Sequence, residues 1–237
     1  MKNLFYLKPL PPEADFCNRE KEIKDLVRYA ENCTNVVLSS PRRFGKTSLA
    51  KRAQNILKRK GIETIYIDFF GVSSIEEVAS KIAAGIYSIV YKEENLLKKT
   101  LRLFSSLRPV IKPDTETGIS ITLEIARGKT GKELLEETMK GFGDFLNIKK
   151  KKYNIVIDEF QEIAELKESS SIEGIMRTYI QHQQNVSYFF IGSRRRILLD
   201  IFNNKNKAFY KSAINYTLPV LPESDTIKYL TSVLAHI

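Results

Sequence analysis

The chain has 237 residues, of which 43% are hydrophobic and 28% are charged, and its formal net charge is +10 at pH 7. These values describe a globular protein with a full core, built as one large domain or as one domain plus a fragment of another. No apolar run is long enough to span a membrane, and the N-terminal stretch lacks the features of a secretory signal. Cys17 and Cys33 suggest neither a disulfide framework nor a zinc site, so the sequence predicts a cytoplasmic protein without membrane contact.

The positive charge leaves two interpretations open. It is compatible with a polyanionic partner such as DNA or RNA, bound through a basic surface. Alternatively, lysine-rich helices simply keep the protein soluble. The four lysines at 149–152 precede a hydrophobic strand, and we interpret them as a solvated loop rather than a binding patch.

Strands and helices alternate along the first part of the chain, which predicts a parallel sheet with crossover helices. The first helix is indicated by the spacing of Ile23, Leu26, Val27 and Ala30. Gly61 is expected to end the second helix. The predicted elements, in order, are a helix within 16–32, a strand within 35–40, a helix over about 46–60, a strand ending at 68, and a helix within 73–93 that is capped by Ser73 or Ser74.

The pattern then changes, because two β-rich stretches flank a Pro-Asp and a Thr-Gly turn. This predicts a β-hairpin inserted between helices at about 105–127. The remaining predicted elements are a helix within 131–147, a strand within 153–160, a helix over about 172–184, a strand within 186–193, a fifth strand within 216–222, and a helix from about 224.

The loop between the first strand and its helix nearly matches the phosphate-binding pattern G-x-x-x-x-G-K-S/T. Gly45 lets the backbone approach a phosphate, Lys46 adds a positive charge for binding and catalysis, and the Thr47 hydroxyl is a magnesium ligand. Ser40 replaces the first glycine, at little cost if its backbone is not left-handed. The alternative is a chance Gly-Lys-Thr at a basic helix start. The residues assigned to nucleotide binding are Ser40, Pro41, Arg42, Arg43, Phe44, Gly45, Lys46, Thr47 and Ser48.

A pair of acidic residues follows the strand "YNIVID", at the edge where open α/β sheets bind ligands. Asp158 is assigned to magnesium, held directly or through water. Glu159 is assigned to catalysis, because it is placed to orient and deprotonate an attacking water. Without a phosphate loop upstream, two solvated acids at a strand end would explain the pair as well.

Ser193 ends the strand "VSYFFIG", and two roles for it remain open. Its hydroxyl could bind a γ-phosphate or the attacking water, or it could cap the helix that follows. The three arginines at 194–196 could meet phosphates or a neighbouring subunit, but we interpret them as a solvated run.

Four segments, "FCNREKEIKDL", "SSPRRFGKTSL", "IVIDEFQEI" and "FFIGSRRRIL", together resemble the archaeal-type ATPases of the AAA+/STAND group of P-loop NTPases. The resemblance spans about 15–221 and implies an α/β fold with an AAA+-like parallel sheet flanked by helices. It implies an ATPase core over 1–222 and, at 223–237, the start of a truncated or minimal C-terminal helical lid. The implied site residues are Asn18, Arg19 and Glu20 near the adenine, Lys46 and Thr47 at phosphate and magnesium, Asp158 and Glu159 as the Walker B pair, and Ser193 as sensor 1.

The expected function is Mg²⁺-dependent hydrolysis of ATP to ADP and phosphate, acting as a conformational switch. Adenine is favoured over guanine by the resemblance and by the lack of an N-K-x-D motif. Lys211 and Ser212 stand where relatives often have Gly-Arg, so this segment offers no arginine for the γ-phosphate. The alternative is therefore a nucleotide-gated binding module with negligible hydrolysis, associated with nucleic acid, a second copy or a regulatory protein.

Overall fold

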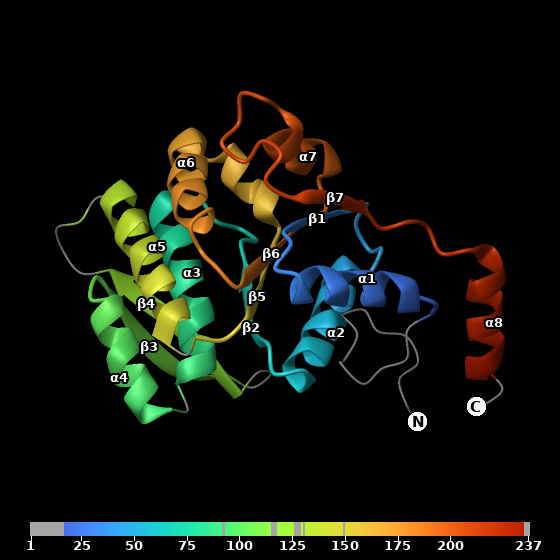
Figure 1. The fold of residues 1–237 in the computed structure, drawn as a ribbon, viewed down its shortest axis with the longest axis horizontal. Helices are drawn as coiled ribbons and strands as arrows, with labels where there is room; N and C mark the ends of the chain where they lie inside the picture. Colours follow the sequence, from blue (N-terminus) through green and yellow to red (C-terminus); the bar gives the residue numbers. More distant parts are fainter. Residues whose placement is uncertain are drawn as a thin grey trace.

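The computed structural model describes residues 17–91, 93–114, 118–125, 129, 131–148 and 150–234. Its centre is a five-stranded parallel sheet with the strand order β2-β5-β6-β1-β7, seen nearly edge-on in Figure 1. The predicted parallel architecture is therefore confirmed. The strands of this sheet are β1 (Val36–Ser39), β2 (Glu63–Asp68), β5 (Tyr153–Asp158), β6 (Val186–Gly192) and β7 (Ile214–Thr217).

Helices cover both faces of this sheet because its central strands are apolar on both sides. Along β5, Ile155 and Ile157 face one hydrophobic cluster and Val156 faces the other. The helices on the Val156 side are α1 (Glu20–Glu31) and α2 (Lys46–Arg59). Those on the opposite side are α3 (Ile75–Val90), α5 (Gly131–Ile148), α6 (Ser169–Ile180) and α7 (Arg195–Asn203).

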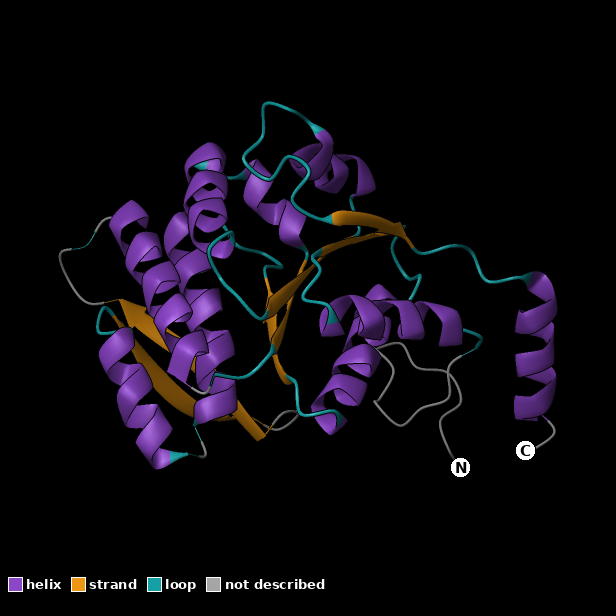
Figure 2. Cartoon of the chain, in the orientation of Figure 1, coloured by secondary structure: helices purple, strands orange, loops and turns teal. Residues whose placement is uncertain are grey.

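The predicted hairpin forms a separate two-stranded antiparallel sheet, visible beside α3 in Figure 2. Its strands are β3 (Leu107–Asp114) and β4 (Gly118–Ile125). The helix before it, α4 (Glu94–Leu103), was not predicted, although its leucines have a helical spacing; among its residues Leu96 and Thr100 are buried. The predicted ranges 1–16 and 235–237, and the hairpin turn at 115–117, lie outside the described residues.

A cluster of four buried phenylalanines fixes the ends of β5 and β6 to the elements that follow them. Phe160, Phe190, Phe202 and Phe209 have ring centroids 4.6–5.7 Å apart. Phe160 begins the short 3-10 helix η1 (Phe160–Glu165), which the sequence did not predict. The cluster therefore fixes the backbone immediately after the two acids predicted at 158–159.

Several helix ends are where local signals predict them. Ser74 caps α3, accepting a hydrogen bond from the Glu77 amide at 3.3 Å, and Gly61 follows α2 with φ +79°. The fifth strand lies at Ile214–Thr217 rather than within 216–222. Pro219 and Pro222 lack the N–H that a longer strand would need.

Two helices differ slightly from their predicted bounds. Helix α6 ends at Ile180 rather than about 184, and α8 (Glu223–Leu234) begins one residue before the predicted start. Helix α8 stands apart from the sheet in Figure 1.

The lysine run at 149–152 was interpreted as a solvated loop. Lys151 pairs with Glu63 at 2.8 Å and Lys152 donates to the Glu31 carbonyl at 2.8 Å. These lysines are exposed but bonded to the protein; Lys149 is outside the described residues.

Candidate nucleotide-binding site

The phosphate-binding loop predicted at 40–48 lies between β1 and α2. Gly45 stands at the N-cap of α2 with φ +81°, a left-handed conformation that glycine adopts without strain. Arg43 is also left-handed, with φ +65°. Because Arg42, Arg43 and Gly45 are exposed, the first turn of α2 opens to solvent at the carboxyl edge of the sheet. Phe44 instead packs against the α1–α2 hydrophobic cluster and holds the loop to the core.

Ser40 is fully buried, and its hydroxyl donates to the Pro41 carbonyl at 3.3 Å. It is not among the described residues with positive φ. A left-handed backbone, which would favour glycine, is therefore not needed at this position. Serine can replace the usual glycine here without backbone strain.

Lys46 is a buried cation within the loop. Its ammonium donates to the carbonyls of Ser40 and Pro41 at 2.9 and 2.8 Å, and its side chain follows the inside of the loop. Burial lowers the pKa of Lys46, while the charges of Glu159 and Asp158 act in the opposite direction. Both acids therefore lie close enough to act on this lysine.

Asp158 joins the loop to the end of β5. Its carboxylate accepts a hydrogen bond from the Thr47 hydroxyl at 2.7 Å and another from the Tyr66 hydroxyl at 2.7 Å. The Glu159 amide donates to its other oxygen at 2.9 Å. Asp158 is only 4% exposed, so these three donors stabilise a carboxylate that is largely removed from water.

Tyr66, on the neighbouring strand β2, is a site residue that the sequence did not indicate. Burial and then the adjacent Asp158 raise the pKa of its hydroxyl far above the usual range, so it remains a donor. A tyrosine in an apolar strand is normally assigned to the core. Only the pairing of β2 with β5 brings it to Asp158.

Glu159 has a left-handed backbone, with φ +50°, and its carboxylate meets two donors. Ser193 donates to Glu159 Oε2 at 3.1 Å, and the side-chain amide of Gln161 donates to the same oxygen. The structure therefore brings Ser193, predicted from a different strand, against the second acid of the pair.

The alternative interpretation of Ser193 as a helix cap is wrong. Helix α7 begins at Arg195, its N-cap is Arg194, and it has no side-chain capping bond. The interpretation of Arg194 as solvated is also wrong, because it forms ion pairs with Glu162, at 2.5 Å, and with Glu165. Arg195 and Arg196 are exposed, as predicted.

The three residues expected near the adenine lie at the start of α1, beside α2. Arg19 is buried, pairs with Glu22 at 2.9 Å, and donates to the Pro219 carbonyl at 2.9 Å. Asn18 donates to Asp225, while Glu20 is exposed. This region therefore ties the start of α1 to the segment that leads into α8.

The residues around Thr47 fit a magnesium ion bound with phosphate. The Thr47 hydroxyl and the Asp158 carboxylate are hard oxygen donors that face each other at 2.7 Å. Within the described ranges, no group of three or more His, Cys, Asp or Glu side chains could hold a metal alone. A Mg²⁺ ion here would take further ligands from phosphate and water, as it commonly does.

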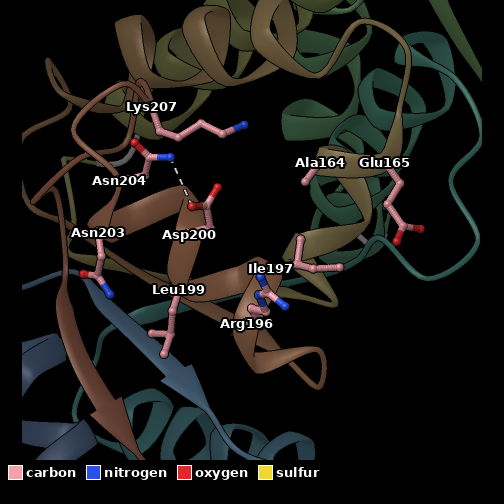
Figure 3. A pocket seen from close by; sticks show the side chains of 9 residues that line it. All are labelled: Ala164, Glu165, Arg196, Ile197, Leu199, Asp200, Asn203, Asn204 and Lys207. Carbon is pink, nitrogen blue, oxygen red and sulfur yellow. Dashed lines mark hydrogen bonds between the residues drawn. The ribbon is translucent and has the colours of Figure 1, made fainter.

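A pocket of about 700 Å³ is lined by the end of η1, by α7 and by the residues that follow α7 (Figure 3). Three of its charged groups are already bonded to protein: Glu165 to Arg194, Asp200 to Asn204 and Lys207 to Glu173. None of its lining residues is a predicted site residue. The lining residues are Ala164, Glu165, Arg196, Ile197, Leu199, Asp200, Asn203, Asn204 and Lys207.

Solved structures share this fold at low sequence identity. The Walker-type ATPase PABY2304 of Pyrococcus abyssi aligns with a TM-score of 0.64 and 18% identity, over 98% of this chain and 61% of that chain. The ORC1 protein of Aeropyrum pernix, solved in complex with DNA, aligns with a TM-score of 0.59 and 15% identity, over 95% of this chain and 52% of its own. The ORC2 protein of the same organism, in ADPNP–ADP complexes, aligns with a TM-score of 0.55 and 16% identity, over 94% and 53%.

The chain thus spans between about half and three fifths of the length of these structures. A comparison with curated proteins finds no match. A family profile described as an ATPase domain predominantly from Archaea matches residues 16–210, which include the phosphate-binding loop, both acids and Ser193. With its α/β P-loop fold, the chain belongs to this family of archaeal-type ATPase domains.

Proposed function

We propose that the protein binds ATP with Mg²⁺ and hydrolyses it to ADP and phosphate, and that this reaction acts as a conformational switch. The observation that carries the proposal is the 2.7 Å hydrogen bond between Thr47 and Asp158. It supports a single site, because it joins the phosphate-binding loop to the acidic end of β5. Membership of an ATPase-domain family supports ATP as the nucleotide.

In this proposal the backbone N–H groups of the loop and the Lys46 ammonium bind the phosphates. Thr47 and Asp158 hold the Mg²⁺ ion, which when bound supplies charge stabilisation to the phosphate oxygens. Glu159 orients a water for in-line attack and accepts its proton. Ser193 lies where its hydroxyl can bind either Glu159 or a phosphate oxygen.

The contacts of the N-terminal region support a switch. If the adenine lies against 18–20, nucleotide exchange acts on Arg19 and Asn18, which bond to Pro219 and Asp225. We therefore propose that 1–222 form the ATPase core and that 223–237 begin a helical lid. The segment from Pro219 to Asp225, which Arg19 and Asn18 contact, joins the core to the lid and carries the signal.

A binding module with negligible hydrolysis is the second candidate, and the segment around Lys211 supports it. Lys211 adopts φ +52° where relatives often have glycine, and Ser212 occupies the place of their arginine. Where arginine fingers act, they contribute about 10³–10⁵ in rate. If the protein is such a binding module, a second copy of the chain or a regulatory protein supplies the arginine that this segment lacks.

Nucleic acid is a further proposed partner. The net charge of +10 supports binding of DNA or RNA, and one structural neighbour was solved with DNA. No helix among the described residues is long and apolar enough to cross a membrane. We retain the cytoplasm as the proposed location on the basis of cysteine usage.

The proposed nucleotide is tested by titrating the wild-type protein with ATP and with GTP, using isothermal calorimetry and product analysis. We expect saturable binding of ATP, at least about tenfold tighter than GTP, a difference of about 1.4 kcal/mol. Release of ADP and phosphate would favour the ATPase over the binding module. Equal binding of both nucleotides, or of neither, would contradict the assignment.

A further inference from the structure

Gln161 is a fully buried polar side chain to which the proposed mechanism gives no role. It lies in η1, immediately after Phe160, whose ring is fixed in the aromatic cluster. Its side-chain nitrogen donates to Glu159 and lies 3.5 Å from Glu162 Oε1. A neutral amide therefore stands between two carboxylates and donates toward both.

The orientation of this amide is determined by charge. If the amide were turned over, its oxygen would face the two carboxylates and would have no proton to donate to either. In the observed orientation, Gln161 Oε1 is buried with no hydrogen-bond partner among the described residues. The interaction with Glu159 is thus maintained although it leaves this oxygen unsatisfied.

The end of β6 is shaped to accept this side chain. A Cβ atom at Gly192 would lie 1.9 Å from Gln161 Oε1, so a larger residue there would displace the amide. Ser193, the next residue, donates to the same Glu159 oxygen that Gln161 contacts. Two neighbouring elements, η1 and the end of β6, therefore hold one carboxylate oxygen from two sides.

Glu159 depends on such support because its left-handed backbone, φ +50°, is an uncommon conformation for this residue type. With Oε2 held by two donors, the carboxylate has one preferred rotamer. Among the described residues, none donates a hydrogen bond to the other oxygen, Oε1. Oε1 can therefore accept a hydrogen bond from a water.

We propose that Gln161 is a positioning residue that holds the Glu159 carboxylate in the orientation from which it activates the attacking water. This inference rests on the proposed ATPase function and adds a residue that acts through Glu159. Gln161 itself need not touch the nucleotide, so its loss affects turnover and leaves ATP affinity unchanged.

The first test replaces Gln161 with methionine, which has similar length and no amide. We expect kcat to fall about 10–100-fold, the equivalent of one hydrogen bond to a charged group, with the ATP dissociation constant within about twofold of wild type. The exposed Gln184→Met variant is the matched control and should retain wild-type kcat. Unchanged kcat in Gln161→Met would overturn the proposal, as would an equal loss of ATP affinity.

A double-mutant cycle separates positioning from a general structural role. If Gln161 acts only through Glu159, adding Gln161→Met to Glu159→Gln should lower kcat by no more than about twofold further. A further loss equal to that in the wild-type background would show that Gln161 acts independently of Glu159. That result would overturn the proposal.

The last test needs no turnover. The side-chain NH₂ signals of Gln161 in an ¹⁵N–¹H spectrum of the nucleotide-free protein are assigned by their absence in Gln161→Met. We expect them to shift in Glu159→Gln and to stay in place in Glu136→Gln, which changes an exposed acid on α5. No shift in Glu159→Gln would overturn the proposal. A shift in a protein without measurable hydrolysis would refute the ATPase function and leave the contact between these residues intact.

Discussion

Replacing Glu159 with glutamine is expected to lower kcat for ATP hydrolysis by about 10²–10⁴-fold, the usual range for loss of a general base. Glutamine keeps the length of the side chain and can still accept from Ser193, which contacts Glu159 at 3.1 Å. It cannot accept a proton from the attacking water. ATP affinity should therefore remain near the wild-type value, which a calorimetric titration beside the steady-state assay would measure.

A suitable control for this variant is Glu136→Gln, which changes an exposed acid on α5. It removes one negative charge, as Glu159→Gln does, but none of the contacts at the end of β5. We expect its kcat to stay within about twofold of wild type, because substitutions on an exposed helix surface usually have small effects. Turnover that survives in Glu159→Gln would remove this residue from the mechanism and favour another base.

Replacing Lys46 with alanine is expected to weaken ATP binding by about 10²-fold. The lysine is 6% exposed and is held by the carbonyls of Ser40 and Pro41, so its charge is directed into the loop. Charge-assisted hydrogen bonds contribute about 1.5–3 kcal/mol, which corresponds to about 10–150-fold in affinity. Titration with ATP, with thermal unfolding to verify the fold, provides the measurement.

The control for this variant is Lys58→Ala, an exposed lysine near the opposite end of the same helix. It makes the same change in net charge, so any difference between the two variants belongs to the position and not to overall electrostatics. We expect its ATP affinity to match wild type. Equal affinity in Lys46→Ala and wild type would mean that nucleotide does not bind at this loop.

The backbone of the site could be predicted from the sequence because its signals are local. An apolar strand, Gly45 at a helix start and two acids after another strand each leave a pattern within about ten residues. The edge at which they meet follows from the parallel order of the strands, since their carboxyl ends lie together. Ser193 was assigned to the same edge by this argument.

The side chains that hold the site could not be predicted, since they depend on how strands pair. Tyr66 reaches Asp158 because β2 pairs with β5. Gln161 and Ser193 both reach Glu159 because β6 ends beside η1. A six-residue 3-10 helix such as η1 has almost no periodic signal. Arg194 was misassigned because its acidic partners lie 32 and 29 residues earlier in the chain.

If the loop and the acidic end of β5 form one Mg²⁺–ATP site, ATP affinity must depend on Mg²⁺ and on Asp158. Affinity is measured by calorimetry with Mg²⁺ and with EDTA, for wild type and for Asp158→Asn, which keeps the shape of a side chain that contacts Thr47 at 2.7 Å. We expect Mg²⁺ to tighten ATP binding by at least about tenfold in wild type and Asp158→Asn to lose most of this gain. An equal Mg²⁺ effect in both proteins, or none in wild type, would show that Asp158 and the loop do not share a Mg²⁺–ATP site.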